Sequence, residues 1–417
     1  MSMATKATLD YIRANGNGDV RQLALKGTKD PEVDMTYALQ QIAGRQTARQ
    51  KLPSWAAVDG LLYPVHLSME QCSSEATARY KARLVASWGA RSLTDLTGGF
   101  GVDFAFMAEG CAAARAASDG EAKGTAAATY VERQEELCAI ARHNFRLLGI
   151  EAEVVCADGT EHLRHMETVD VIFVDPARRD SHGGRTYGIS DCQPDVAGLS
   201  ELLAGKGRRV MVKLSPMLDW RKAVQDLGPQ RVSEVHIVAV ANECKELLVV
   251  MEDRGDDGAD STSVTCVNIV SGGDEQRFSF NISRNEERLR VGDGTSGMRG
   301  YLYEPNASVM KAGCFAALAA AYGVRQIAQN SHLFVSENRC ETFPGRVFRI
   351  DGMTTLARRN LRNALGGTDR ANIAVRNFPL TADQLRQRLR IRDGGDTYIF
   401  GTTLADGSHV LLIAHKA

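Results

Sequence analysis

The chain has 417 residues, 44% of them hydrophobic, so it can bury the cores of two to four globular domains. Its 50 Lys and Arg residues nearly balance 51 Asp and Glu residues, for a net charge of -1. This balance excludes a whole-protein electrostatic field that would recruit nucleic acid or an anionic membrane, so any attraction to a polyanion must be local.

The nine cysteines are scattered singly, without a CxxC pair. This usage favours reduced thiols over a disulfide framework or a structural zinc site, and we expect no metal. The N-terminal segment lacks the apolar core of a signal peptide, and no later stretch approaches the roughly 18 apolar residues that span a membrane. We therefore expect a soluble, cytoplasmic protein with no membrane partner; the oligomeric state stays open.

Residues 1–90 are predicted to form short helices, because apolar residues recur every three to four positions between Gly and Pro breaks. From Ser92 the pattern changes to short apolar runs that alternate with helical stretches. The predicted strands are "SLTDL", "ATYVE", "AEVVCA", "DVIFVD", "RRVMVKL", "SEVHIVAV" and "LLVVMED". This alternation predicts an α/β fold over residues 91–255, a Rossmann-like, mostly parallel sheet with an antiparallel edge strand.

A turn-rich acidic stretch, "DRGDDGADSTS", predicts a boundary after this sheet. Two alternating segments, "VTCVNIV" and "RFSFNI", and an apolar helix then predict a small α+β domain over residues 256–336. Residues 337–417 are predicted to form a second one. The Ala/Gly-rich patch from Cys111 to Ala128 is interpreted as a surface loop.

The first predicted strand runs into a glycine-rich turn, "TDLTGGFGVDF", with Asp95, Thr97, Gly99 and Gly101 at alternate positions. The pattern is D-x-G-x-G-x-G with Thr97 in the first glycine position; the dinucleotide pattern G-x-G-x-x-G fails at Phe104. An acid before the turn would repel a diphosphate and suit a cationic ligand. The alternative is a turn that only packs a helix on a strand.

Two more acids follow successive strands. Glu132 ends the second strand and could accept both hydroxyl hydrogens of a ribose, or could cap the next helix. Asp158 follows the third strand and could contact an adenine amino group, or be a turn aspartate. Because open α/β sheets bind ligands at the carboxyl ends of their strands, the shared position favours a ligand site.

The fourth strand ends in "VDPARRD", in which Asp175 and Pro176 precede Arg178 and Arg179. Together with "DLTGGFGVD", "VE" and "AD", this series resembles class I S-adenosylmethionine-dependent methyltransferases. The segments "LSMEQCSSEATARYKA", "NECKEL" and "GRVF...NIAVRNFPL...LRIRDGGDTYIFGTTL" resemble the bacterial methyltransferase family that carries a ferredoxin-like insert and a THUMP-like C-terminal domain.

The resemblance implies S-adenosyl-L-methionine as the cofactor. It makes Asp95, Gly99 and Gly101, with Thr97 in place of a glycine, the cradle for the methionine part, Glu132 the ribose ligand and Asp158 the adenine contact. Asp175, Pro176 and Arg178 form the acceptor-side motif, which is similar to the "DPPY" loop of base methyltransferases.

In such loops the acid or a nearby carbonyl accepts a hydrogen bond from a base amine, and Asp175 fits that role. Arg178 replaces the stacking aromatic; it could stack on a base or bind phosphate, or pair with Asp180 or Asp191. Ser215-Pro216 stands where pyrimidine C5 methyltransferases place a cysteine, which disfavours that chemistry unless Cys192 or Cys244 reaches the site.

Arg179 and Lys213 are candidate substrate contacts, although Lys213 could equally be an edge lysine, and "NECKEL" could border the acceptor or be a charged hairpin. From Ser336 onward the chain carries 13 Lys/Arg against 8 Asp/Glu. Arg358, Arg359 and Arg362 share one predicted helix, and Arg386, Arg388, Arg390 and Arg392 alternate. Such arrays bind phosphates, or are solvated faces; the THUMP-like resemblance favours RNA as the partner.

The sequence thus predicts an RNA methyltransferase, with a base nitrogen favoured over C5. The alternatives are a methyltransferase for a small molecule or a protein, and a non-catalytic RNA-binding protein with a structural methyltransferase fold.

Overall fold

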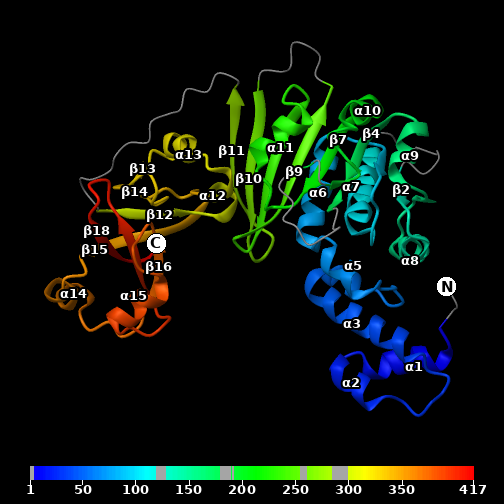
Figure 1. The fold of residues 1–417 in the computed structure, drawn as a ribbon, viewed down its shortest axis with the longest axis horizontal. Helices are drawn as coiled ribbons and strands as arrows, with labels where there is room; N and C mark the ends of the chain where they lie inside the picture. The colour runs from blue at the N-terminus through cyan, green and yellow to red at the C-terminus, as the bar shows by residue number, and fades with distance from the viewer. Residues whose placement is uncertain (1–3, 119–127, 179–188, 190–191, 254–260, 284–298) are drawn as a thin grey trace. The chain divides into compact units, whose positions relative to one another are not determined.

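The computed structural model describes the whole chain except residues 1–3, 119–127, 179–188, 190–191, 254–260 and 284–298 (Figure 1). Residue contacts divide it into two compact units. The first unit comprises residues 1–235 and 247–260. The second comprises residues 236–246 and 261–417. The predicted boundaries near residues 90, 255 and 336 remain predictions.

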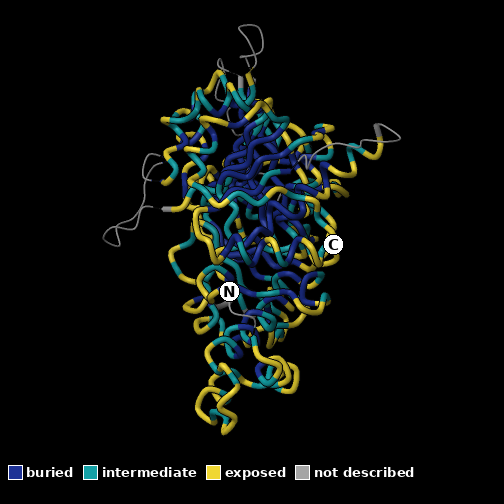
Figure 2. The backbone as a smooth tube through the Cα atoms, turned by 90° about the vertical axis from the view of Figure 1, so that its right-hand side faces the viewer, coloured by how far each residue is buried: buried dark blue, intermediate teal, exposed yellow. Residues whose placement is uncertain are grey.

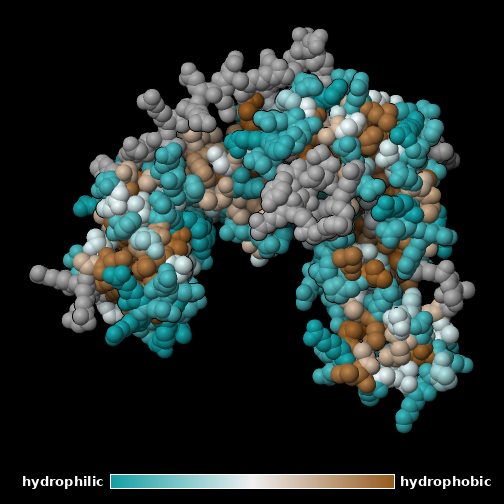
Figure 3. All heavy atoms as spheres, viewed as in Figure 1, coloured by the Kyte–Doolittle hydropathy of each residue, from teal (hydrophilic) through white to brown (hydrophobic). Residues whose placement is uncertain are grey.

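The first unit begins with helices and continues into strand-helix alternation, as the sequence predicts. The N-terminal helices are α1 (Lys6–Asn15), α2 (Val20–Lys26), α3 (Met35–Lys51), α4 (Pro53–Ala56), α5 (His66–Gln71) and α6 (Glu75–Ser87). Several begin at a side chain that accepts a backbone N-H of the first turn, at Thr5, Asp19, Asp34 and Ser74. Exposed apolar side chains of this region are Leu9, Leu25, Val65 and Leu67. Brown patches are visible on the part of the surface in Figure 3 that these helices form.

The alternating part of the chain supplies β1 to β9 and the helices between them. The strands are β1 (Leu93–Asp95), β2 (Ala128–Glu132), β3 (Glu153–Cys156), β4 (Val169–Val174), β7 (Gly207–Leu214), β8 (Val232–Val240) and β9 (Glu243–Glu252). The helices are α7 (Val102–Ser118), α8 (Glu135–Leu148), α9 (Gly159–His165), α10 (Ser200–Lys206) and α11 (Trp220–Leu227). A separate two-stranded sheet joins β5 (Ala177–Arg178) to β6 (Cys192–Gln193).

The seven strands β1 to β4 and β7 to β9, together with β10 (Ser261–Ile269) and β11 (Glu275–Ser283), form a nine-stranded sheet of order β11-β10-β8-β9-β7-β4-β1-β2-β3. β7, β4, β1, β2 and β3 pair in parallel, and β9 pairs antiparallel with β7. The sequence predicts the antiparallel strand at the edge of the sheet. In the structure this strand, β9, lies between β7 and β8 instead. The backbone tube is buried along the central strands (Figure 2), as expected when helices cover both faces of a parallel sheet.

Two strands from the predicted α+β domain over residues 256–336 extend this large sheet, although residue contacts group them with the second unit. β10 (Ser261–Ile269) and β11 (Glu275–Ser283) pair antiparallel, and β10 neighbours β8. The alternating apolar residues correctly predict that these segments are strands. Alternation does not specify which strand a segment pairs with, which is why their place was missed.

The second unit also holds a seven-stranded sheet of order β13-β14-β12-β15-β18-β17-β16. Its strands are β12 (Tyr301–Pro305), β13 (Arg325–Gln326), β14 (Phe334–Ser336), β15 (Gly345–Thr354), β16 (Asn372–Arg376), β17 (Thr397–Thr403) and β18 (His409–Lys416). Its helices are α12 (Ala307–Ala312), α13 (Phe315–Tyr322), α14 (Arg358–Leu365) and α15 (Ala382–Leu389). Phe348 and Phe400 lie at its core with ring centroids 4.9 Å apart.

Candidate functional site

The turn between β1 and α7 has no room for a side chain at Gly98 or Gly101. A Cβ on Gly98 would lie 2.2 Å from Cε2 of Tyr130, and one on Gly101, whose φ is +86°, would lie 2.9 Å from Cζ of Phe145. Gly99 also has a positive φ of 56°. The backbone thus runs close against β2 and α8, as a ligand-binding glycine turn requires.

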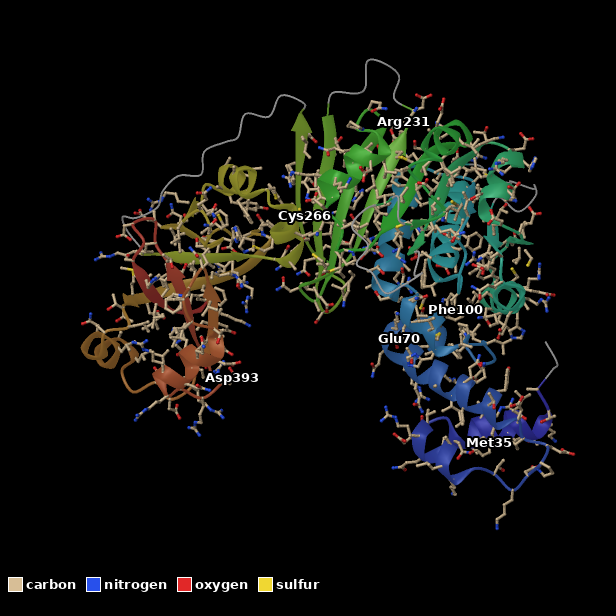
Figure 4. The ribbon with its side chains drawn as sticks, viewed as in Figure 1. Met35, Glu70, Phe100, Arg231, Cys266 and Asp393 are labelled. Carbon is tan, nitrogen blue, oxygen red and sulfur yellow. The ribbon has the colours of Figure 1, made fainter. Side chains whose placement is uncertain are left out.

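Phe100, labelled in Figure 4, lies in the same turn and connects it to the N-terminal helices. Its ring packs edge-on against Trp55 of α4, with centroids 5.3 Å apart. The amide of Asn144 on α8 exchanges two hydrogen bonds of 2.9 Å with the backbone of Leu62. The N-terminal region therefore contacts the glycine turn through Trp55 and α8 through the backbone of Leu62.

Asp95, at the end of β1, is buried and accepts two hydrogen bonds from Thr97. The backbone N-H and the hydroxyl of Thr97 both donate to Oδ1 of Asp95, at 2.8 and 3.2 Å. Burial, and then repulsion from the carboxylates of Asp103 and Asp175, raise the pKa of Asp95 well above its ordinary value despite these donors. A cation bound beside this buried carboxyl group would stabilise its charged form. Asp95 is therefore suited to bind a cationic ligand.

Thr97 also connects the two sides of the site. Its hydroxyl oxygen accepts a hydrogen bond of 2.7 Å from the backbone N-H of Asp175. A glycine in this position could make neither this bond nor the hydroxyl bond to Asp95. The departure from the usual glycine therefore gives a direct contact between the ends of β1 and β4.

Glu132 lies at the end of β2, and one of its carboxylate oxygens contacts the glycine turn. Oε2 accepts the N-H of Gly99 and Oε1 accepts the N-H of Gln134, each at 2.9 Å. Each carboxylate oxygen keeps a second lone pair, so the residue can still accept hydroxyl hydrogens of a ribose. Its contact with Gly99 places it beside the turn, as the sequence predicts.

Asp158 is exposed and caps the N-terminus of α9. Its Oδ1 accepts the backbone N-H groups of Thr160 and Glu161, at 2.8 and 3.2 Å. These bonds agree with the alternative that Asp158 is a turn aspartate. The adenine contact remains a prediction, which the position at the carboxyl end of β3 still allows.

Asp175 follows β4 and is held by Lys213 of β7. Nζ of Lys213 lies 2.6 Å from Oδ2 of Asp175 and 3.3 Å from Oδ2 of Asp103, and its side chain is only 12% exposed. Two carboxylate partners favour a role for Lys213 in positioning Asp175 over a direct phosphate contact. The side chain of Asp175 is 38% exposed and so remains accessible to an acceptor, with Pro176 directly after it.

Three further residues lie behind this pair and are not predicted from the sequence: Ser73, Lys81 and Asp103. Asp103, in the first turn of α7, accepts a hydrogen bond of 2.7 Å from the hydroxyl of Ser73. The fully buried Lys81 of α6 lies 3.1 Å from Oδ1 of Asp103. A lysine between Ala78 and Leu84 on the apolar face of a predicted helix was the available signal.

Burial alone would raise the pKa of Asp103, but the ammonium groups of Lys81 and Lys213 and the hydroxyl of Ser73 hold it below its usual range. We therefore expect Asp103→Ala to lower the free energy of unfolding by about 3 to 5 kcal/mol, because it removes the carboxylate that two enclosed lysines share. Urea denaturation measures the loss. The matched control is Asp226→Ala, which breaks an exposed pair of 2.9 Å with Lys222 and should cost less than about 1 kcal/mol. Equal losses in the two variants would contradict the structural role of Asp103.

Part of the acceptor-side motif falls outside what the structure describes. The backbone of Arg178 pairs with that of Cys192 in the β5–β6 sheet, but the side chain of Arg178 is not described. Arg179, Asp180 and Asp191 lie outside the described residues altogether. Cys192 is buried directly across from Arg178, so it is the cysteine to test if carbon methylation is found.

The "NECKEL" segment begins at Asn242 in the turn between β8 and β9, continues into β9, and is hydrogen-bonded to α12. Ala241 and Asn242 both have positive φ, of 49° and 64°, as in a tight two-residue hairpin. Oδ1 of Asn242 accepts the N-H of Ala307 at 2.8 Å, and the thiol of Cys244 donates to the carbonyl of Ala307 at 3.3 Å. Burial raises the pKa of Cys244, which makes it a poor nucleophile. These contacts favour an anchoring role for the hairpin.

The alternating arginines of the second unit are partly neutralised. Arg386 lies 2.7 Å from Asp393, labelled in Figure 4, and Arg392 pairs with Asp369. Arg388 ends α15 close to Arg390, which has a left-handed conformation, and both are exposed. Helix α14 carries Arg358, Arg359 and Arg362, whose side chains lie outside the described set.

The described residues near the glycine turn fit S-adenosylmethionine. The turn brings its backbone close to β2 and α8, Asp95 is a buried acid whose charged form a cationic ligand would stabilise, and Glu132 offers carboxylate oxygens beside the turn. Among the described residues no group of three or more His, Cys, Asp or Glu is arranged to hold a metal ion. Of the helices that the structure describes, none combines the length and apolar character that crossing a bilayer requires.

Comparisons with known proteins identify related domains and relatives. A family model for a ferredoxin-like domain matches residues 301–344, and one for a THUMP-like domain matches residues 345–416. The chain is 27% identical over 350 residues to uncharacterized S-adenosylmethionine-dependent methyltransferases of two Mycobacterium tuberculosis strains, CDC 1551 / Oshkosh and ATCC 25618 / H37Rv, covering 82% of this chain and 84% of each relative.

The crystal structure of a proposed methyltransferase from Porphyromonas gingivalis W83 is similar over 100% of both chains, with 33% sequence identity and a TM-score of 0.83. The protein is thus an enzyme whose cofactor is S-adenosyl-L-methionine. The chain belongs to the class I S-adenosylmethionine-dependent methyltransferases, in the family that carries a ferredoxin-like domain and a THUMP-like C-terminal domain.

Proposed function

We propose that this enzyme methylates a nitrogen atom of a base in RNA. The cofactor is held by Asp95, Thr97, Gly99, Gly101, Glu132 and Asp158, and the acceptor base lies beside Asp175, Pro176 and Arg178. The observation that carries the proposal is the position of Asp175. It follows β4, next to β1, and bonds through its backbone to Thr97 of the glycine turn and through its carboxylate to Lys213.

The chemistry asked of the protein is mainly positioning. The methyl group of the bound cofactor is already electrophilic, so the protein has to align the acceptor and keep its lone pair available. Asp175 accepts hydrogen bonds at the oxygen that Lys213 leaves accessible, and an amino group that donates there is oriented by the contact. Lys213 limits the freedom of Asp175 and so fixes that orientation.

RNA as the acceptor is supported by the C-terminal region. Residues 345–416 match a THUMP-like domain, and the chain from Ser336 carries 13 Lys/Arg against 8 Asp/Glu. Since Arg386 and Arg392 have acidic partners, the exposed Arg388 and Arg390, with Arg358, Arg359 and Arg362, are our candidates for phosphate contacts. Such contacts hold RNA without reading its sequence and leave base selection to the acceptor side.

The test is transfer of a labelled methyl group from the cofactor to total RNA of a strain that lacks the gene, followed by mass spectrometry of the nucleosides. We expect one nitrogen-methylated nucleoside that the wild-type strain already carries. Asp175→Ala should abolish transfer at saturating cofactor. The double variant Arg388→Glu/Arg390→Glu should raise the KM for RNA and leave cofactor affinity unchanged.

Two outcomes would overturn parts of the proposal. Transfer to protein or small molecules, with RNA unlabelled, would favour the alternative acceptor classes. A product methylated at pyrimidine carbon 5, formed by the wild type and lost in Cys192→Ser, would replace the nitrogen assignment with cysteine chemistry.

A further inference from the structure

Five charged residues lie together where β1, β4 and β7 end: Asp95, Asp103, Asp175, Lys81 and Lys213, which we call the charge network. Lys81 pairs with Asp103 at 3.1 Å, and Lys213 pairs with Asp103 at 3.3 Å and with Asp175 at 2.6 Å. Within this set three residues are acids and two are cations. A bound cation favours the ionised form of Asp95, and with all five residues ionised the charge network carries one surplus negative charge.

The surplus falls on the most enclosed part of the network. Asp95 is 1% exposed, and its hydrogen bonds come from Thr97, which is a neutral donor. The carboxylates of Asp103 and Asp175 act on Asp95 with the same sign and help to raise its pKa. Water screens this charge poorly because Asp103 and both lysines are also enclosed.

The cofactor and its product differ by one charge. S-adenosylmethionine carries a sulfonium cation, whereas S-adenosylhomocysteine, the product after methyl transfer, has a neutral thioether in the same place. The adenosine, the carboxylate and the ammonium group are common to both, so contacts with these parts bind both ligands equally. Only an interaction that depends on the charge near the methionine part, or on the methyl group itself, can give the two ligands different dissociation constants.

We infer that the surplus negative charge of the charge network makes the site prefer the sulfonium cofactor to its thioether product, and so assists product release. The inference rests on the cofactor site given under the proposed function. Loss of the sulfonium charge on methyl transfer leaves the surplus uncompensated. Binding of the product then weakens without any change in the contacts to the adenosine part.

The test compares dissociation constants for the two ligands by titration calorimetry on the full chain. We expect the ratio of the product's Kd to the cofactor's Kd to exceed one in the wild type. Asp175→Asn, which removes a negative charge, should lower the ratio about tenfold, the effect of a unit charge roughly 10 Å away at an effective dielectric constant near 20. Lys213→Met, which removes a positive charge, should raise it.

Two controls isolate the charge effect from damage to the fold. Asp19→Asn removes the charge of an exposed aspartate that caps α2 and has no role in the cofactor site, and should leave the ratio unchanged. An analogue with a protonated amine in place of the sulfonium should follow the cofactor in every variant. Circular dichroism establishes whether each variant is folded. If Lys213→Met unfolds, the test relies on Asp175→Asn, which should fold because the side chain of Asp175 is 38% exposed.

The results separate this inference from the proposed function. If the cofactor binds but the ratio stays the same in Asp175→Asn, or moves in the same direction in the Asp175 and Lys213 variants, the role of the surplus charge is wrong and the cofactor site stands. If neither ligand binds the wild type, the cofactor site itself is wrong.

Discussion

Replacing Asp95 by asparagine should weaken the binding of S-adenosylmethionine at least tenfold while raising the stability of the protein at neutral pH. The residue is 1% exposed and lies near two other carboxylates, Asp103 and Asp175. Asparagine keeps an oxygen for the two bonds from Thr97 and removes the buried charge. We expect the free energy of unfolding to rise by about 1 to 3 kcal/mol, the range for relieving a poorly compensated buried group.

The sign of the pH dependence follows from the direction of the shift. Burial and the neighbouring acids raise the pKa of Asp95, so the folded protein holds this proton more tightly than the unfolded chain. Its contribution to stability is present below the ordinary pKa of an aspartate and is lost as the pH rises through the raised pKa. The stability gap between the variant and the wild type should therefore close as the pH falls.

Cofactor binding should show the linked effect. A cation that binds near Asp95 favours its charged form, so binding releases a proton and the affinity rises with pH through the raised pKa. Calorimetry in two buffers of different ionisation enthalpy measures that release, which should vanish in Asp95→Asn. A variant that binds the cofactor normally, or that is less stable than the wild type at neutral pH, would contradict this account.

The second large effect is expected at Gly159, the first residue of α9. A Cβ there would lie 2.1 Å from the carbonyl oxygen of Leu96 and 3.1 Å from its carbonyl carbon, which is backbone and has little freedom to move. Leu96 directly follows β1 and donates its N-H to the carbonyl of Phe173 on β4. Gly159→Ala should therefore cost about 1 to 3 kcal/mol of unfolding free energy, and should weaken cofactor binding by displacing the start of the glycine turn.

Gly205→Ala is the matched control, since it makes the same substitution within a helix of the same unit. Gly205 lies in α10, and a Cβ there would meet nothing within 4 Å. Alanine should stabilise the protein by roughly 0.5 to 1 kcal/mol, because it reduces the freedom of the unfolded chain. Denaturation curves and calorimetry for the two variants should thus show opposite signs in stability and a loss of affinity only in Gly159→Ala.

The sequence predicts the architecture well where local pattern and topology agree. Each predicted strand from "SLTDL" to "LLVVMED" is present, and the acids at the ends of β1, β2 and β4 lie near the glycine turn. Strand ends can be predicted because apolar runs end at the point where polar side chains begin. A parallel sheet then brings these ends to one edge.

The rest depends on contacts between residues distant in sequence. Nothing in the local pattern around Lys81 indicates that it meets Asp103, or that Asp103 also holds Lys213, which lies 110 positions further on. Pairing of β10 with β8 is likewise a tertiary property, because both segments have the composition of a strand. Thr97 departs from the glycine pattern expected at this position. Its role is indicated only by its hydrogen bonds with Asp95 and Asp175.

The strand order of the large sheet limits how the chain can be shortened. β8 lies between β9 and β10, so a protein cut after residue 253 would keep every residue assigned to cofactor binding and lose the neighbour on the other side of β8. The bare N-H and C=O groups of β8 would then be open to strands from other molecules, which is a common cause of aggregation. The smallest soluble fragment that binds the cofactor should therefore retain β10 and β11, although neither strand contributes a residue to the site.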